Sequence, residues 1–258
     1  MTRTPPHRPP AGRARLYRLR AEQALAAIPA GSISVLLTDP PYSSVNRRGG
    51  SGAHLQHWFP GGLSWVELGR LLALARRKLR SDGIAFVMVN GDGLHDALGA
   101  LQRAGFARIR TITWDRTYPG LGGGLRHQTE FILVGLLPGS RTLSGVDLVS
   151  VPAVGPGTAG RYPTQKPDAL GRELARMASI GLGDVVLDPF VGSGALLVGA
   201  RERGAHVLGC DIAPLAIRQA TARLGAAGAT ARPARSSSPR ARTGQRRPVP
   251  KRQPRRGA

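Results

Sequence analysis

The chain has very little cysteine and no long apolar stretch. Cys210 is the only cysteine among 258 residues, which argues against a disulfide framework and against a cluster of thiolate metal ligands. No run approaches about 20 consecutive apolar residues, so we expect no membrane-spanning helix. The N-terminus is rich in arginine and proline but lacks the apolar core of a secretory signal. These absences predict a soluble, cytoplasmic protein.

Candidate metal ligands are also scarce. Of the six histidines, only His54 and His57 have a spacing that resembles a ligand pair. They lie in a glycine-rich stretch with no carboxylate nearby, so we expect no metal site there.

Acidic residues are few and are missing from both ends of the chain. The sequence has 15 acidic residues against 37 lysines and arginines, a formal charge of +22. Residues 1–15 hold four arginines and no acid, and residues 229–258 hold nine arginines, one lysine and no acid. We expect both ends to be disordered basic arms, because they lack the apolar residues needed for a core. A solubilising tail and a nucleic-acid-binding arm that acts through counterion release both fit this composition.

Between the arms, short apolar runs alternate with amphipathic segments, and glycine or proline separates them. This alternation predicts one α/β domain over residues 16–228, with a mostly parallel sheet and helices on both faces. Ser64 and Glu67 have the spacing of a capping box. Residues 43–63 and 138–163 are expected to be irregular. Strands are expected at 33–38, 84–89, 107–114, 131–136, 185–187 and 206–210, and helices at 16–28, 64–79, 93–104, 168–180, 194–203 and 214–224.

The most informative motif is Asp39-Pro40-Pro41-Tyr42, directly after the apolar run 33–38. The Asp39 carboxylate and the Pro40 carbonyl can each accept a hydrogen bond from an exocyclic NH2 group, and Tyr42 offers a face for stacking. Neither proline has a backbone N–H, so this wall is rigid and presents only acceptors. The motif therefore suits a planar heterocycle that carries an amino group, although Asp-Pro is also common in ordinary turns.

A second motif follows the apolar strand 185–187. Asp188-Pro189-Phe190-Val191-Gly192-Ser193-Gly194 has the composition of a strand, a glycine turn and the start of a helix. Gly192 and Gly194 allow the backbone to approach a ligand closely. Leu197 stands where a dinucleotide fingerprint would have a third glycine, which favours a smaller nucleoside ligand. Asp211 ends the next strand, where an acid can accept hydrogen bonds from ribose hydroxyls.

In this order, the motifs resemble the permuted, or β-group, amino DNA methyltransferases that modify adenine N6 or cytosine N4. The similarity runs from about Leu19 to Leu224 and includes Trp114, Glu130 and the segment Thr164-Gln165-Lys166-Pro167. It implies a Rossmann-like fold, S-adenosylmethionine as cofactor and double-stranded DNA as substrate. It also implies that Asp39, Pro40, Pro41 and Tyr42 hold a flipped base. The residues that would bind the cofactor are Thr164, Gln165, Lys166, Asp188, Pro189, Phe190, Gly192, Ser193, Gly194 and Asp211.

The sequence also departs from the family pattern. Ala195 stands where the family usually has threonine, and Arg116 replaces a customary lysine after Trp114. The segment expected to recognise the DNA sequence, about 138–160, is short, which argues against stringent target recognition.

Several alternatives stay open at this level. Adenine N6 is favoured over cytosine N4 only by the first letter of the Asp39 motif. An RNA base or a protein amide is a less favoured substrate, because such enzymes normally place the cofactor half first. The alternative that is not an enzyme is a basic DNA-binding protein with a non-catalytic methylase fold. The sequence does not decide between a monomer and a homodimer. The methyltransferase hypothesis requires that the two motifs face one another.

Overall fold

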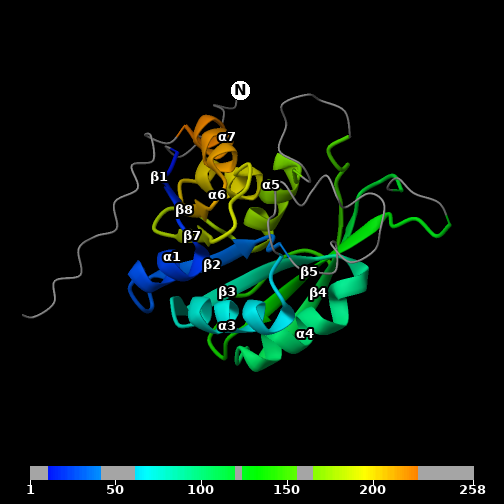
Figure 1. Cartoon of the computed structure of the whole chain (residues 1–258), viewed down its shortest axis with the longest axis horizontal. Coiled ribbons are helices and arrows are strands. Elements are labelled where there is room, and N and C mark those ends of the chain that lie inside the picture. Colours follow the sequence, from blue (N-terminus) through cyan, green and yellow to red (C-terminus); the bar gives the residue numbers. More distant parts are fainter. Residues whose placement is uncertain (1–10, 42–61, 120–123, 156–164, 226–258) are drawn as a thin grey trace, which may run out of the picture.

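The computed structural model describes residues 11–41, 62–119, 124–155 and 165–225. They form an eight-stranded sheet covered by helices (Figure 1). The strands are β1 (Ala14–Arg18), β2 (Ile33–Thr38), β3 (Leu79–Val89), β4 (Arg108–Asp115), β5 (Thr129–Leu136), β6 (Leu148–Ser150), β7 (Val185–Asp188) and β8 (His206–Asp211). The helices are α1 (Ala21–Ala27), α3 (Trp65–Arg76), α4 (Leu94–Arg103), α5 (Asp168–Met177), α6 (Val198–Glu202) and α7 (Pro214–Leu224), with short 3-10 turns η2 (Gly91–Gly93) and η3 (Ala195–Leu197).

The sheet has the strand order β1-β8-β7-β2-β3-β5-β4-β6. Neighbouring strands from β1 to β3 pair in parallel, whereas β5 runs antiparallel to both β3 and β4. β6 pairs in parallel with the end of β4. The mostly parallel α/β architecture is therefore confirmed. β2 is buried along its whole length, as expected for a central parallel strand that is covered on both faces.

Alternate side chains of the central strands supply two hydrophobic cores. Val35 and Leu37 of β2 pack in the core that includes α5, α6 and α7, whereas Leu36 packs in the core of α1, α3 and α4. Figure 1 shows α3 and α4 on one side of the sheet and α5, α6 and α7 on the other. This period of two follows from the pleat of a strand, which sends successive side chains to opposite faces.

The connections leave β2 and β7 in opposite directions. The chain passes from β2 through α3 to β3 on one side, and from β7 through α6 to β8 on the other. β2 and β7 are themselves paired neighbours. In open α/β sheets, ligands bind outside the carboxyl ends of the strands at the point where the connections diverge. The topology therefore places a ligand site at the carboxyl ends of β2 and β7.

The N-terminal segment differs from the prediction. Residues 14–18 form strand β1, which pairs with β8 in the register Leu16 to Gly209, and the helix begins only at Ala21. Leu16 is buried, Ala14 packs partly buried against the same core and Arg15 is exposed, so this strand contributes apolar side chains to the core. Residues 14 and 15 therefore belong to the folded domain and not to a disordered arm.

Other boundaries differ in smaller ways. β3 begins at Leu79 and not at residue 84, and a register shift against β2 accommodates the additional residues. The segment 138–163, expected to be irregular, contains β6. The Ser64 capping box of α3 is confirmed, since the Ser64 N–H donates to Glu67 Oε2 at 2.8 Å and the Glu67 N–H donates to Ser64 Oγ at 3.3 Å.

Some predictions fall outside the described residues. These are the histidine pair at 54 and 57, residues 1–10 of the N-terminal arm and the tail 229–258. None of the described helices is long and apolar enough to cross a bilayer. Within the described ranges, no group of three His, Cys, Asp or Glu side chains is placed to share a metal ion.

Candidate active site

The first motif continues directly from the carboxyl end of β2. Pro40 is buried, and the Asp39 side chain keeps 23% of its surface exposed. Asp39 therefore sits at the boundary between the core and the outside, where it can meet a ligand. Pro41 is half-buried, and its carbonyl accepts a hydrogen bond from the Leu63 N–H at 2.7 Å. Tyr42, the expected stacking residue, lies outside the described residues.

A hydrogen bond joins the two motifs. Thr38 Oγ1, at the end of β2, donates to Asp188 Oδ1 at 2.7 Å, and both side chains are buried. The Phe190 N–H donates to the same oxygen at 3.0 Å. The buried Asp188 carboxylate therefore has a hydrogen-bond partner on the neighbouring strand. The expectation that the two motifs meet is confirmed to this extent: they lie at the same edge of the sheet, and Thr38, the residue before Asp39, contacts Asp188 directly.

The glycine turn after β7 has the left-handed backbone that glycine permits. Gly192 has a φ of 48° and Gly194 a φ of 80°, values that side chains other than glycine adopt only with strain. The Gly192 N–H donates to Asp211 Oδ2 at 3.0 Å, and Arg223 of α7 donates to the Ser193 carbonyl at 2.8 Å. The turn is thus held in place from β8 and from α7.

Asp211 ends β8, next to the glycine turn. Its two oxygens accept the backbone N–H groups of Gly192 and, at 2.9 Å, of Ala213. Burial raises the pKa of the Asp211 carboxyl, and these hydrogen bonds oppose that rise. Each carboxylate oxygen has a second lone pair, so Asp211 can still accept a hydrogen bond from a ligand hydroxyl.

Asp188 is the most strongly perturbed acid at this edge. Burial raises the pKa of its carboxyl to about 7, while the hydrogen bonds from Thr38 and Phe190 act in the opposite direction. The negative charges of Asp39 and Asp211 raise the pKa further. A buried acid in this condition gains from a cationic ligand, because the cation compensates the charge that burial penalises.

Lys166 lies against Asp39. Its Nζ is 2.5 Å from Asp39 Oδ2 and 3.5 Å from Glu130 Oε2. The resemblance placed this lysine with the cofactor. In the structure, its ammonium group contacts Asp39, the residue expected to hold the base. Gln165, next to it, is half-buried, and Thr164 lies outside the described residues.

Two further side chains near the site had no direct signal in the sequence. Thr38 was treated only as the last residue of an apolar run, although its hydroxyl joins the two motifs. Arg116 was noted only as a departure from the family pattern, yet its NH1 is 3.2 Å from Glu130 Oε1. A threonine at the end of an apolar run, directly before an acidic motif, is a signal that could have pointed to Thr38. No comparable local signal exists for Arg116.

The segment thought to recognise DNA is closely attached to the sheet where it is described. Trp114, which is buried, donates its indole N–H to the Val151 carbonyl at 2.8 Å, and the Tyr118 hydroxyl is 3.1 Å from the Ala153 carbonyl. Arg141 forms an ion pair with Asp184 at 2.8 Å. Residues 138–153 are therefore part of the folded body.

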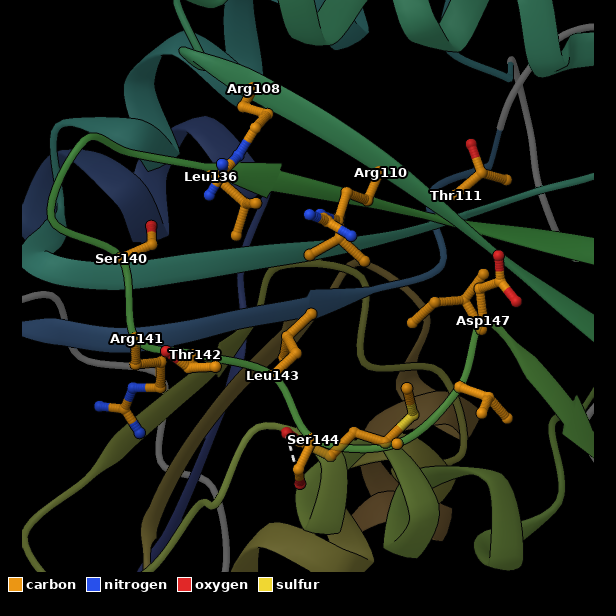
Figure 2. A pocket seen from close by; sticks show the side chains of 15 residues that line it. Arg108, Arg110, Thr111, Leu136, Ser140, Arg141, Thr142, Leu143, Ser144 and Asp147 are labelled. Atoms are coloured by element: carbon orange, nitrogen blue, oxygen red, sulfur yellow. Dashed lines mark hydrogen bonds between the residues drawn. The ribbon is translucent and has the colours of Figure 1, made fainter.

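A hollow of about 400 Å³ lies between this segment and β4. Figure 2 shows Arg108 and Arg110 of β4 on one side of it, and Thr142, Leu143 and Ser144 on the other. β4 runs in the same direction as β2, since both β3 and β4 are antiparallel to β5. Arg108 begins β4, so this end of the hollow lies at the sheet edge opposite the two motifs, and the hollow is separate from the candidate site.

Comparisons with known proteins find similarity to DNA methylases. The N6/N4 family model, described as DNA methylase, matches residues 139–222. The match contains Lys166, the glycine turn and Asp211, whereas Asp39 precedes it. The Type II methyltransferase M2.DpnII of Streptococcus pneumoniae is 27% identical over 217 residues, which cover 70% of this chain and 78% of that protein.

Solved structures show the same fold. The putative DNA modification methylase TTHA0409 of Thermus thermophilus, complexed with S-adenosyl-L-methionine, is 24% identical with a TM-score of 0.60, covering 82% of this chain and 93% of that one. The cytosine-N4-specific PvuII DNA methyltransferase is 15% identical with a TM-score of 0.62, covering 83% and 87%. The family model, the related sequence and the fold together show that this chain is similar to the N6/N4 amino DNA methyltransferases.

Proposed function

We propose that the protein transfers a methyl group from S-adenosylmethionine to the N6 amino group of adenine in DNA. The observation that carries the proposal is the hydrogen bond from Thr38 to Asp188 at 2.7 Å. It holds the amine-binding motif and the glycine turn at adjacent strand ends, which a transfer between two bound reactants requires.

The residues at this edge fit the proposed cofactor. Both hydrogen bonds that Asp188 receives from described residues go to Oδ1, which leaves Oδ2 available to a donor such as an ammonium group. The raised pKa of Asp188, caused first by burial, favours a cationic ligand. Asp211 can accept from ribose hydroxyls. We therefore assign Asp188, the turn from Pro189 to Gly194, and Asp211 to cofactor binding. Thr164, Gln165 and Lys166 stay predictions for the same role.

The chemistry divides between the two motifs. S-adenosylmethionine supplies an electrophilic methyl group on a sulfonium when it is bound. An exocyclic amine on a base is a poor nucleophile, because its lone pair is delocalised into the ring. Asp39 Oδ1 and the Pro40 carbonyl would each accept one hydrogen of this amine and so favour the pyramidal nitrogen that can attack. Acceptors fixed where positive charge develops also stabilise the transition state.

The target amine is not accessible for attack inside a duplex, so the base is expected to leave the stack. Tyr42 is the residue proposed to replace the lost stacking, and Pro41 would keep this wall rigid.

Cytosine N4 is the second candidate. The PvuII enzyme, which has this fold, is cytosine-N4-specific, and the amino groups of the two bases make nearly the same demands on Asp39 and Pro40. Mass spectrometry of nucleosides from DNA treated with the purified protein distinguishes the products. N6-methyladenine supports the proposal, N4-methylcytosine supports the second candidate, and the absence of either product contradicts both.

Replacing the proposed amine acceptor gives a sharper test. Asp39→Ala is expected to bind labelled S-adenosylmethionine with near-normal affinity while losing turnover, because the carboxylate contacts the base and not the cofactor. Asp92→Ala, at an exposed residue of η2, is the matched control and should retain activity. Substantial methylation by Asp39→Ala would remove the assignment of Asp39.

A further inference from the structure

Four side chains of alternating charge form a row that ends on Asp39. Lys166 Nζ lies 2.5 Å from Asp39 Oδ2 and 3.5 Å from Glu130 Oε2. The other oxygen of Glu130 pairs with Arg116 NH1 at 3.2 Å. The side chains are only 11% exposed for Lys166, 18% for Glu130 and 19% for Arg116. Screening by solvent is therefore weak, and each charge acts strongly on the next.

The row is built from separate elements of the fold. Asp39 follows β2, Glu130 lies in β5, Arg116 follows β4, and Lys166 comes two residues before α5. Arg116 is fixed further by its N–H, which donates to the Gln128 carbonyl at 3.0 Å, and by its guanidinium, which donates to the His127 carbonyl. The charges are thus anchored at their own positions instead of being carried by one flexible loop.

The hydrogen bond from Lys166 to Asp39 goes to one identified carboxylate oxygen. The hydrogen bond goes to Oδ2, and no other described residue donates a hydrogen bond to Oδ1. This division matters if Asp39 binds the target amine, since one oxygen has to remain available for it.

We propose that Lys166 and Glu130 are positioning residues for Asp39. Lys166 holds Oδ2, and Glu130 holds Lys166, so that Oδ1 is presented to the target amine. This inference rests on the proposed function, because it gives Asp39 its role as amine acceptor. It assigns to Lys166 a function in the catalytic half of the site.

The electrostatics agree with this geometry. Burial raises the pKa of Asp39, the charge and hydrogen bond of Lys166 lower it, and the charge of Glu130 raises it. The charged groups that face Asp39 are Lys166 before α5, Glu130 on β5 and Asp188 on β7, since the charge of Asp39 also acts on Asp188. Removing the lysine should therefore raise the pKa of Asp39, and removing the glutamate charge should lower it.

The opposite directions expected for the pKa of Asp39 in the two variants provide the test. We would label aspartate with 13C at the carboxyl group, identify the Asp39 signal by its loss in Asp39→Asn, and follow it against pH in protein without DNA. The titration midpoint should move to higher pH in Lys166→Met and to lower pH in Glu130→Gln. Lys78→Met is the matched control, because Lys78 also donates from a partly buried position, to the Ile28 carbonyl at 2.7 Å, but far from Asp39 in the chain. Its midpoint should equal that of the wild type.

Activity adds a second readout. The acid limb of the kcat profile should move in the same two directions, whereas a loss of structure would lower the rate without moving the limb. An unmoved midpoint in either site variant, or movement of both in one direction, overturns the inference. If Lys166→Met fails to fold, the isosteric Glu130→Gln still decides. The NMR titration needs no methylation. If the midpoints of the two variants shift as expected but the wild-type protein modifies no DNA, only the proposed function is contradicted.

Discussion

Asp188→Asn is expected to make the protein more stable at neutral and alkaline pH. The Asp188 carboxyl is 2% exposed and receives hydrogen bonds from Thr38 and from the Phe190 N–H. Asparagine keeps the shape, and its side-chain oxygen can accept the same two hydrogen bonds. What the substitution removes is the negative charge, which burial penalises.

The magnitude follows from the pKa of Asp188, which rises from 3.8 to about 7 on burial. Between these values the folded state binds more protons than the unfolded chain, so rising pH favours unfolding. Over about three pH units, at about 1.4 kcal/mol each, the penalty reaches roughly 4 kcal/mol above neutral pH. Below about pH 4 the carboxyl is protonated in both states, and the penalty vanishes.

Urea unfolding of wild type and Asp188→Asn near pH 5 and near pH 8 measures the free energy that the buried Asp188 charge costs the folded state. The free energy of unfolding of the variant should exceed that of the wild type at the higher pH, and the gap should shrink by about half or more at the lower pH. Asp92→Asn, at an exposed position, should show no such dependence. If Asp188→Asn is the less stable protein near pH 8, the reasoning is refuted. The variant is still expected to bind S-adenosylmethionine more weakly.

Two further predictions concern the surroundings of the site. Trp114→Phe removes the indole donor to the Val151 carbonyl and should lower the free energy of unfolding by about 1–3 kcal/mol, measured by chemical denaturation; an unchanged value would show that this contact does not stabilise residues 148–153. Truncation after Leu224 removes nine arginines and a lysine from residues 229–258. It should weaken DNA binding and flatten its dependence on salt with little change in methyl transfer, and an unchanged salt slope would show that the tail only solubilises the protein.

The elements that were predictable are those whose signals are local. Helix α7 was expected at Pro214–Leu224 and lies there, because a proline suited to its first turn and a glycine after its end mark its bounds. Strand β1 was missed, since this five-residue segment with arginine at positions 15 and 18 is stabilised mainly by its pairing with β8. That partner lies almost the whole length of the domain away in the chain.

The site residues were likewise predictable only where the signal is local in the sequence. Asp39, Asp188 and Asp211 could be selected from the sequence because each follows an apolar strand. The contacts between the motifs could not be selected, since Thr38 and Asp188 are 150 residues apart and Lys166 and Asp39 are 127 apart. Only the strand order of the sheet brings them together.

The two ends of the described domain converge on one residue. The Gly12 N–H donates to the Arg201 carbonyl at 3.1 Å, and a Cβ at Gly225 would lie 3.6 Å from the Arg201 guanidinium. Helix α7 also packs against β1 (Figure 1). Any group fused to either extremity of residues 12–225 will therefore be held at the same corner. β1 and β8 both begin near this corner. A short peptide linker between the two ends of residues 12–225 would therefore cyclise the domain without disturbing the carboxyl ends of the strands.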